Sequence, residues 1–236
     1  MFLFKRKRII FISCIIISSI FYSSIIKQSN SHFLSVSSTP VSNHIIILDA
    51  GHGKPDGGAI STDGNTIESE LNLEIALKLQ NLLESSGCTV ILTRSDQNGI
   101  YESNATTIRS QKISDMKNRA LIANNSNAEL FVSIHMNKLK QNQYSGWQTF
   151  YKNNDITSKN IANNIQSSLN HFMKKENKRE IKSISGIYLT KHVKIPLVLI
   201  ECGFLSNYEE TQLLNDTNYQ NELAWSIYIG LMDYLK

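Results

Sequence analysis

The sequence contains little cysteine, with three residues in a chain of 236. Cys14 lies in an apolar run near the N-terminus, so the rest of the chain holds only Cys88 and Cys202. No spacing motif connects these two residues. This excludes the dense disulfide framework of small secreted domains and leaves at most one bridge open. We expect both residues to be buried thiols on strands.

The chain also lacks an excess of charge outside its first few residues. Lys5, Arg6, Lys7 and Arg8 account for the net charge of +4, because the other 20 of the 24 lysines and arginines balance the 20 aspartates and glutamates. A neutral body offers no basic surface for nucleic acid, so we expect no nucleic-acid partner. The apolar content of 41% and the charged content of 19% are typical of a globular protein.

An uncharged apolar run, residues 9–26, follows the basic cluster. A helix of that length spans about 27 Å, close to the roughly 30 Å hydrocarbon core of a bilayer. A basic flank before such a run indicates a signal peptide or a signal anchor. We therefore predict an export segment over 1–27, a Ser-rich tether over 28–43 and a single folded domain over 44–236. That domain would work outside the cytoplasm, either secreted or anchored, with membrane contact only through the N-terminal segment.

Beyond residue 44, short apolar strand patterns alternate with helical stripes, and no internal repeat is visible. This alternation predicts an α/β fold with a largely parallel or mixed sheet, in which sites form beyond the carboxyl ends of the strands. The predicted strands are Ile45–Asp49, Cys88–Thr93, Glu129–His135, Gly146–Tyr151 and Pro196–Glu201. The predicted helices are Glu70–Glu84, Asp115–Asn124, Asp155–Phe172 and Asn218–Leu235.

Four residues with metal-binding or acid–base side chains fall near that edge of the sheet. His52 lies in the glycine-rich loop after the first strand, and Glu68 opens the helix beyond the loop. His135 and Glu201 each end a later strand. Two histidines and one carboxylate are a standard set for catalytic zinc, with a fourth position left for water, and a further carboxylate transfers the proton. We predict His52, Glu68 and His135 as ligands of one Zn²⁺ and Glu201 as the acid–base group, although no HExxH motif is present.

Each ligand, taken alone, also has a structural explanation. His52 could cap its loop, Glu68 could be a carboxylate favoured by the helix dipole, and His135 could be a hydrogen-bonded core histidine. Glu201 is harder to explain in this way. It follows the apolar run LVLI, and a buried carboxylate is costly unless it is paired or bound.

Other charged residues near these patterns have two interpretations. Asp49 could orient His52 by accepting a hydrogen bond, or it could cap the loop. Arg94, Arg109 and Arg119 could contact a carboxylated substrate, but structural or surface ion pairs are the favoured interpretation of each.

Four strings carry a resemblance to a known family. LDAGHGKPDGGA, ESELNLEIALKL, FVSIHMN and LVLIECGFLSN resemble, in order and spacing, the zinc-dependent N-acetylmuramoyl-L-alanine amidases, from about Ile45 to the C-terminus. The resemblance implies peptidoglycan as substrate, one zinc ion and a central, roughly six-stranded sheet flanked by helices. It also implies that His52, Glu68 and His135 bind the zinc and that Glu201 is catalytic.

Finer features look like the germination-specific amidases of spore-forming bacteria. They are the segments over 113–137, 146–152 and 219–230, together with the short chain and its export segment. The likeness implies action in the cortex-facing space of the developing spore, where peptide removal from muramic acid precedes muramic-δ-lactam formation by a separate deacetylase. An accessory protein that stabilises metal binding is compatible with this picture, but no sequence feature identifies one.

Two other functions stay open at this point. A zinc exopeptidase acting on wall peptides would use the same chemistry. A non-catalytic wall-binding protein would not need the four site residues, so their presence argues against it.

Overall fold

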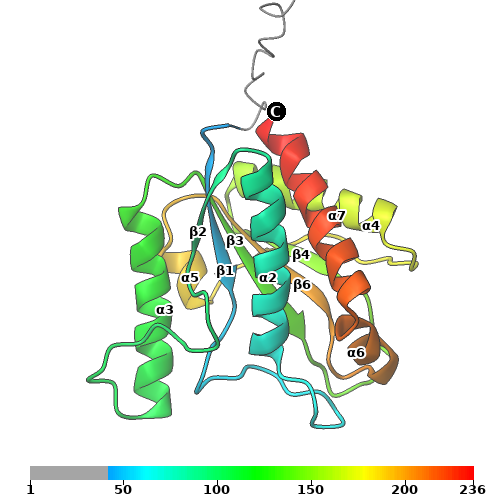
Figure 1. The fold of residues 1–236 in the computed structure, drawn as a ribbon, viewed down its shortest axis with the longest axis horizontal. Helices are drawn as coiled ribbons and strands as arrows, with labels where there is room; N and C mark the ends of the chain where they lie inside the picture. Colours follow the sequence, from blue (N-terminus) through cyan, green and yellow to red (C-terminus); the bar gives the residue numbers. More distant parts are fainter. Residues whose placement is uncertain (1–41) are drawn as a thin grey trace, which may run out of the picture. The chain divides into compact units, whose positions relative to one another are not determined.

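The computed structural model describes residues 42–236, in which helices flank a central sheet (Figure 1). The predicted export segment lies outside these residues, as does the predicted tether except for its last two positions. Within the described range, none of the helices combines the length and the apolar character needed to cross a bilayer.

The sheet has six strands in the order β2-β1-β3-β6-β4-β5. Its strands are β1 (Ile45–Ala50), β2 (Thr89–Leu92), β3 (Leu130–Asn137), β4 (Gln148–Lys152), β5 (Lys182–Ile184) and β6 (Leu197–Phe204). The first three strands and β6 are parallel, β4 pairs antiparallel to β6, and β5 pairs parallel to β4. The predicted α/β fold with a six-stranded mixed sheet is therefore confirmed.

Within residues 42–236, six helices connect or flank these strands. They are α2 (Glu68–Ser85), α3 (Ile108–Asn125), α4 (Ile156–Phe172), α5 (Tyr188–His192), α6 (Tyr208–Leu214) and α7 (Thr217–Leu235). Asp155 and Asp216 cap α4 and α7, which begin within a residue of their predicted starts. The predicted start of α3 at Asp115 was wrong. A capping box between Thr107 and Ser110 starts this helix seven residues earlier.

The two faces of the sheet are covered unequally. Alternate residues such as Leu48 and Ile134 join the large core under α2, α4 and α7. The residues between them, such as Ile47 and Phe131, pack in a small cluster with α3 and α5. Figure 1 shows α2 and α7 side by side, with α3 well apart from them. The thinly covered face is the one on which the polar strand residues emerge.

Several elements differ from the sequence prediction. His135 and Glu201 do not end their strands, because β3 continues to Asn137 and β6 to Phe204. The short elements β5, α5 and α6 were not predicted. Cys202 is a buried thiol on β6, as expected, whereas Cys88 is buried just before β2 begins.

Candidate metal centre

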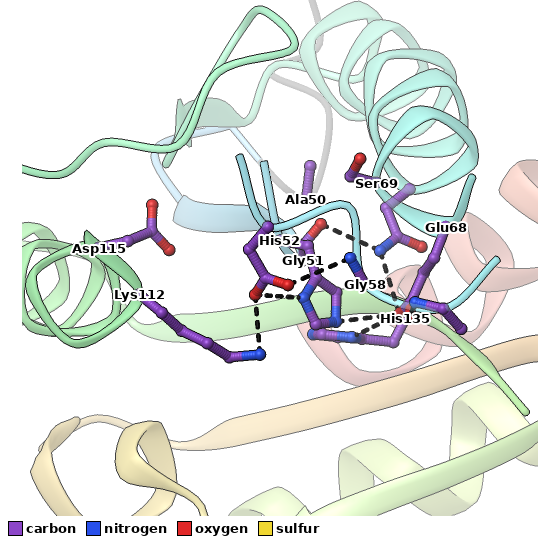
Figure 2. A network of polar contacts seen from close by, with 12 residues as sticks. Ala50, Gly51, His52, Gly58, Glu68, Ser69, Lys112, Asp115 and His135 are labelled. Atoms are coloured by element: carbon purple, nitrogen blue, oxygen red, sulfur yellow. Dashed lines mark hydrogen bonds and ion pairs between the residues drawn. The ribbon is translucent and has the colours of Figure 1, made fainter. Parts of the chain in front are cut away.

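The predicted ligands meet where the strand order of the sheet changes direction. After β1 the chain adds β2 on one side of it and then β3 on the other, which places the carboxyl ends of β1 and β3 at a switch point. His52 follows β1, His135 lies in β3, and Glu68 is the first residue of α2. One ligand atom from each residue lies within 4.8 Å of the others, and Figure 2 shows the three side chains turned toward one another.

Glu68 is the centre of this cluster. Its Oε1 lies 3.0 Å from His135 Nδ1 and 3.3 Å from His52 Nε2. The backbone N–H of Met136 donates to the same oxygen at 3.1 Å, and the N–H of Ala59 donates to Oε2 at 2.8 Å. The carboxylate is therefore fixed by strand β3 and by the loop before α2, independently of any bound ion.

Two glycines of the loop allow the ligands to come this close. A Cβ on Gly51 would lie 2.3 Å from the Nε2 atom of His135. A Cβ on Gly58 would lie 2.6 Å from Glu68 Oε2, and its φ of +72° also favours glycine. The glycine-rich loop is thus required for the close approach of backbone and ligands.

The electrostatics of the cluster favour a positive charge between the ligands. Burial lowers the pKa of His52, but the hydrogen bonds to Asp56 and Glu68 outweigh it and raise the pKa to about 9. Burial likewise works to raise the pKa of Glu68, yet the bonds to His135 and His52 hold it well below its usual range. Two imidazoles and a carboxylate with converging donor atoms fit a divalent cation such as Zn²⁺, so these residues form a candidate metal site.

Glu201 lies next to the ligand cluster on the neighbouring strand. It is the direct partner of His135 in the pairing of β3 with β6. Its Oε2 atom is buried and accepts no hydrogen bond. Burial, together with the negative charge of Glu68, raises the pKa of Glu201 to about 7, although His135 and His52 oppose the shift. A buried carboxylate that lacks a partner and titrates near neutrality is typical of an acid–base group.

A cavity of about 280 Å³ opens beside His135 and Glu201. Helix α3 forms one wall, and the segment from β5 through α5 forms the other. Its apolar lining consists of Met116, Ile184, Ile187, Tyr188, Leu189 and Leu199. The second wall is built from β5 and α5, which the sequence did not predict. The cavity could therefore not have been predicted either.

Asp49 does not orient His52. It is fully buried and accepts hydrogen bonds from Ser133 Oγ at 2.6 Å, Thr93 Oγ1 at 2.8 Å and Arg119 Nη1 at 2.5 Å. The carboxylate that meets the Nδ1 atom of His52 is instead that of Asp56, whose Oδ2 lies 2.9 Å away. Asp56 was missed, and its position four residues after the histidine in the same loop was the available signal.

Two of the three arginines support the backbone of the loop. Arg94 Nη2 donates to the carbonyl of Gly51 at 3.0 Å, and Arg119 Nη2 donates to the carbonyl of His52 at 2.5 Å. Both guanidinium groups also donate to the carbonyl of Ala50. The favoured structural interpretation is thus confirmed for Arg94 and Arg119, while Arg109 is exposed on α3.

Comparison with known proteins agrees with this site. The Amidase_3 family model, described as N-acetylmuramoyl-L-alanine amidase, matches residues 46–233, a range that includes all four site residues. The chain belongs to this family. The resemblance carried by the four sequence strings is therefore confirmed, and the fold and the activity class follow from it.

Several relatives of this amidase are known. The germination-specific N-acetylmuramoyl-L-alanine amidase of Bacillus subtilis is 38% identical over 197 residues, which cover 84% of this chain and 82% of the relative. The structure of the CwlD amidase from Clostridioides difficile in complex with the GerS lipoprotein is 50% identical, with a TM-score of 0.80 over 82% of this chain and 98% of that one. The catalytic domain of CwlV from Bacillus (Paenibacillus) polymyxa is 30% identical, with a TM-score of 0.70 over 81% and 98%.

Proposed function

We propose that this amidase cleaves the bond between the lactyl group of N-acetylmuramic acid and the L-alanine of the stem peptide, with one Zn²⁺ held by His52, Glu68 and His135. The observation that carries the proposal is the convergence of three ligand atoms within 4.8 Å beside the unpartnered carboxylate of Glu201, in a chain of this family. When bound, Zn²⁺ supplies Lewis acidity, which polarises a carbonyl group and makes water a stronger acid.

Glu201 moves the proton in this reaction. Its carboxylate accepts a proton from the attacking water and donates it to the alanine nitrogen, which leaves as an amine. A pKa of about 7 suits both transfers, because the group must be a base in the first step and an acid in the second. The pairing of β3 with β6 keeps Glu201 beside His135, so base and ligand do not depend on a mobile loop for their spacing.

Product analysis tests the reaction. The protein is incubated with purified peptidoglycan, and the products are identified by mass spectrometry. We expect stem peptides with a free N-terminal L-alanine and glycan strands that have lost their peptides. A zinc exopeptidase would instead release single amino acids from peptide ends, and a wall-binding protein would release nothing. His52→Ala and His135→Ala should lose both activity and bound zinc, measured by elemental analysis of purified protein.

We also propose that the substrate is the peptidoglycan of the spore cortex, reached outside the cytoplasm. The proposal is supported by the 38% and 50% identity to the germination-specific enzyme and to CwlD, and by the export pattern of residues 9–26. Spores that lack this protein should contain no muramic-δ-lactam, measured by chromatography of digested cortex. Cortex with a normal lactam content would contradict the assignment.

An accessory protein is proposed on narrower support. The C. difficile CwlD structure contains the GerS lipoprotein. We propose that this amidase also binds a lipoprotein on the outer face of the membrane. Such a protein should co-purify with the tagged full-length chain from sporulating cells and be identifiable by mass spectrometry. Its absence would indicate that the amidase works alone.

A further inference from the structure

The metal ligand His52 is held from the side that faces away from the other two ligands. Its Nε2 points toward Glu68, while its Nδ1 lies 2.9 Å from Asp56 Oδ2. The Nζ of Lys112 lies 2.9 Å from that same carboxylate oxygen. Figure 2 shows Lys112 across His52 from the ligand cluster. The three side chains therefore form a chain of contacts that ends at the candidate metal site.

A simple loop-capping role does not account for the contacts of Asp56. Capping requires one acceptor, and the N–H of Gly58 donates to Oδ1 at 3.2 Å. The second oxygen of the carboxylate is left for His52 and Lys112. His52 also has a φ of 62°, a conformation that side-chain-bearing residues rarely adopt. Its backbone carbonyl is held by Arg119 from α3, and its ring is held by Asp56 from the same loop.

Arg119, which binds the carbonyl of His52, and Lys112, which binds Asp56, come from one face of α3. Lys112, Asp115, Met116 and Arg119 follow the spacing of a helical stripe, and all four line the cavity beside the site. Arg119 holds the carbonyl of His52, and Lys112 holds the carboxylate that meets its ring. This stripe of α3 is thus largely charged, runs from the exposed Lys112 to the buried Arg119, and contacts the loop that carries the ligand.

We propose that Asp56 is the positioning residue of His52 and that Lys112 keeps Asp56 in place. By accepting the Nδ1 proton, the carboxylate selects the tautomer that leaves Nε2 free to bind a cation, and it fixes the plane of the ring. The inference rests on the proposed metal site, but it assigns a role to two residues outside the ligand set.

Metal affinity and the tautomer of His52 test this role together. The dissociation constant for Zn²⁺ is measured on the full-length protein by competition with a chromophoric chelator. We expect Asp56→Ala to weaken binding by about 10- to 100-fold. Asp56→Asn keeps an acceptor of the same size, so it should restore part of the affinity. In ¹H–¹⁵N spectra of the metal-free protein at alkaline pH, the proton of the neutral His52 ring should lie on Nδ1 in the wild type and be distributed over both ring nitrogens in Asp56→Ala.

A matched control separates positioning from charge. Asp63→Ala removes the same charge from an exposed turn of the same loop, and it should change the Zn²⁺ affinity by less than about twofold. Lys112→Met should weaken binding less than Asp56→Ala, because the N–H of Gly58 still holds the carboxylate. Circular dichroism of the metal-free variants verifies that they fold.

The outcomes are distinguishable. If the wild type binds no Zn²⁺, the metal site is wrong and the positioning role falls with it. If the wild type binds Zn²⁺ and Asp56→Ala binds it as tightly as Asp63→Ala does, only the positioning role is overturned. An unchanged His52 tautomer in Asp56→Ala would overturn it as well.

Discussion

Two charged clusters lie at the same edge of the sheet and differ in whether their hydrogen bonding is complete. The first surrounds Arg119, which is paired with Asp49 and Asp115 and also donates to backbone carbonyls. The second contains Glu68 and Glu201 with the two histidines, and there Glu201 Oε2 has no partner. We call the first the closed cluster, because its hydrogen bonds are all made, and the second the open cluster, because one of its buried oxygens has no partner. Both clusters are largely buried.

This difference in hydrogen bonding indicates that the closed cluster stabilises the fold and that the open cluster serves binding and catalysis. A buried ion pair with all its hydrogen bonds made holds elements together, and here it joins α3 to β1 and to the loop after β1. A cluster with two carboxylates and an unmet hydrogen bond gains stability only when a cation or a substrate enters. Removing a group from the closed cluster should therefore cost stability, and removing one from the open cluster should cost activity.

The largest expected effect is a loss of turnover when Glu201 of the open cluster is replaced. Glu201→Gln keeps the shape of the side chain but removes the carboxylate that we propose as the acid–base group, so turnover should fall by about 10²- to 10⁴-fold. Zinc content should stay at the wild-type level, and stability should not decrease, because a buried charge without a partner is lost. Turnover is followed by peptide release from peptidoglycan. A variant within threefold of wild-type turnover would show that Glu201 is not the acid–base group.

Breaking the closed cluster should give the next largest effect. Arg119→Met leaves the charge of Asp49 buried and unpaired, which should lower the free energy of unfolding by about 3–5 kcal/mol. Urea unfolding in the presence of a chelator measures this without a contribution from bound metal. Arg109→Met on the exposed part of α3 is the control and should stay within about 0.5 kcal/mol of the wild type. Equal losses in the two variants would show that the buried ion pairs of Arg119 contribute no special stability.

The pH dependence of metal binding tests whether the carboxylates around His52 hold a positive charge in the open cluster. His52 must be neutral to bind a cation, and its pKa in the metal-free protein is raised to about 9. Protons therefore compete for the site below pH 9, so the apparent Zn²⁺ affinity should fall by about tenfold for each pH unit below that value and level off above it. Chelator competition between pH 7 and pH 10 measures the profile. A flat profile below pH 9 would mean that the carboxylates do not hold a proton on His52.

The smallest effect is expected at a partly exposed ion pair. Its two charged atoms lie about as close together as those of the closed cluster, but the pair is not buried. His44 Nδ1 lies 2.7 Å from Glu129 Oε2, but both side chains are partly exposed. Glu129→Gln should change the free energy of unfolding by less than about 1 kcal/mol, because water screens the pair. The same urea assay applies. A loss comparable to that of Arg119→Met would show that burial is not what makes the closed cluster strong.

The main strands and the four site residues were predictable for a shared reason. Runs such as FVSIH and LVLIE are largely apolar, so His135 and Glu201 at their ends stand out, as does His52 in the glycine-rich loop that follows the run IIILD. Glu68 could be found in a similar way, because it precedes the apolar stripe of α2. The short elements β5, α5 and α6 span three, five and seven residues, which is too few for a periodic pattern to develop.

The supporting residues around the site could not be predicted in the same way. Asp49 and Asp56 are both near His52 in sequence, and only the tertiary contacts show that Asp49 turns to Arg119 while Asp56 meets the imidazole. Helix α3 buries only Arg119, Ala120 and Ala123, so no long apolar pattern reveals which of its faces packs against the sheet. Its role depends on which loop faces it, and that is a property of the whole fold.

The placement of Glu201 opposite His135 on paired strands has a consequence for how the sequence can change. The spacing between these side chains is set by the ladder of hydrogen bonds from Phe131 and Leu197 onward, not by the 65 residues that separate them in the chain. Insertions or deletions in the intervening loops leave that ladder intact. A slip of one position between the strands would instead turn Glu201 into the apolar core, so correct strand alignment also sets the placement of Glu201 beside His135.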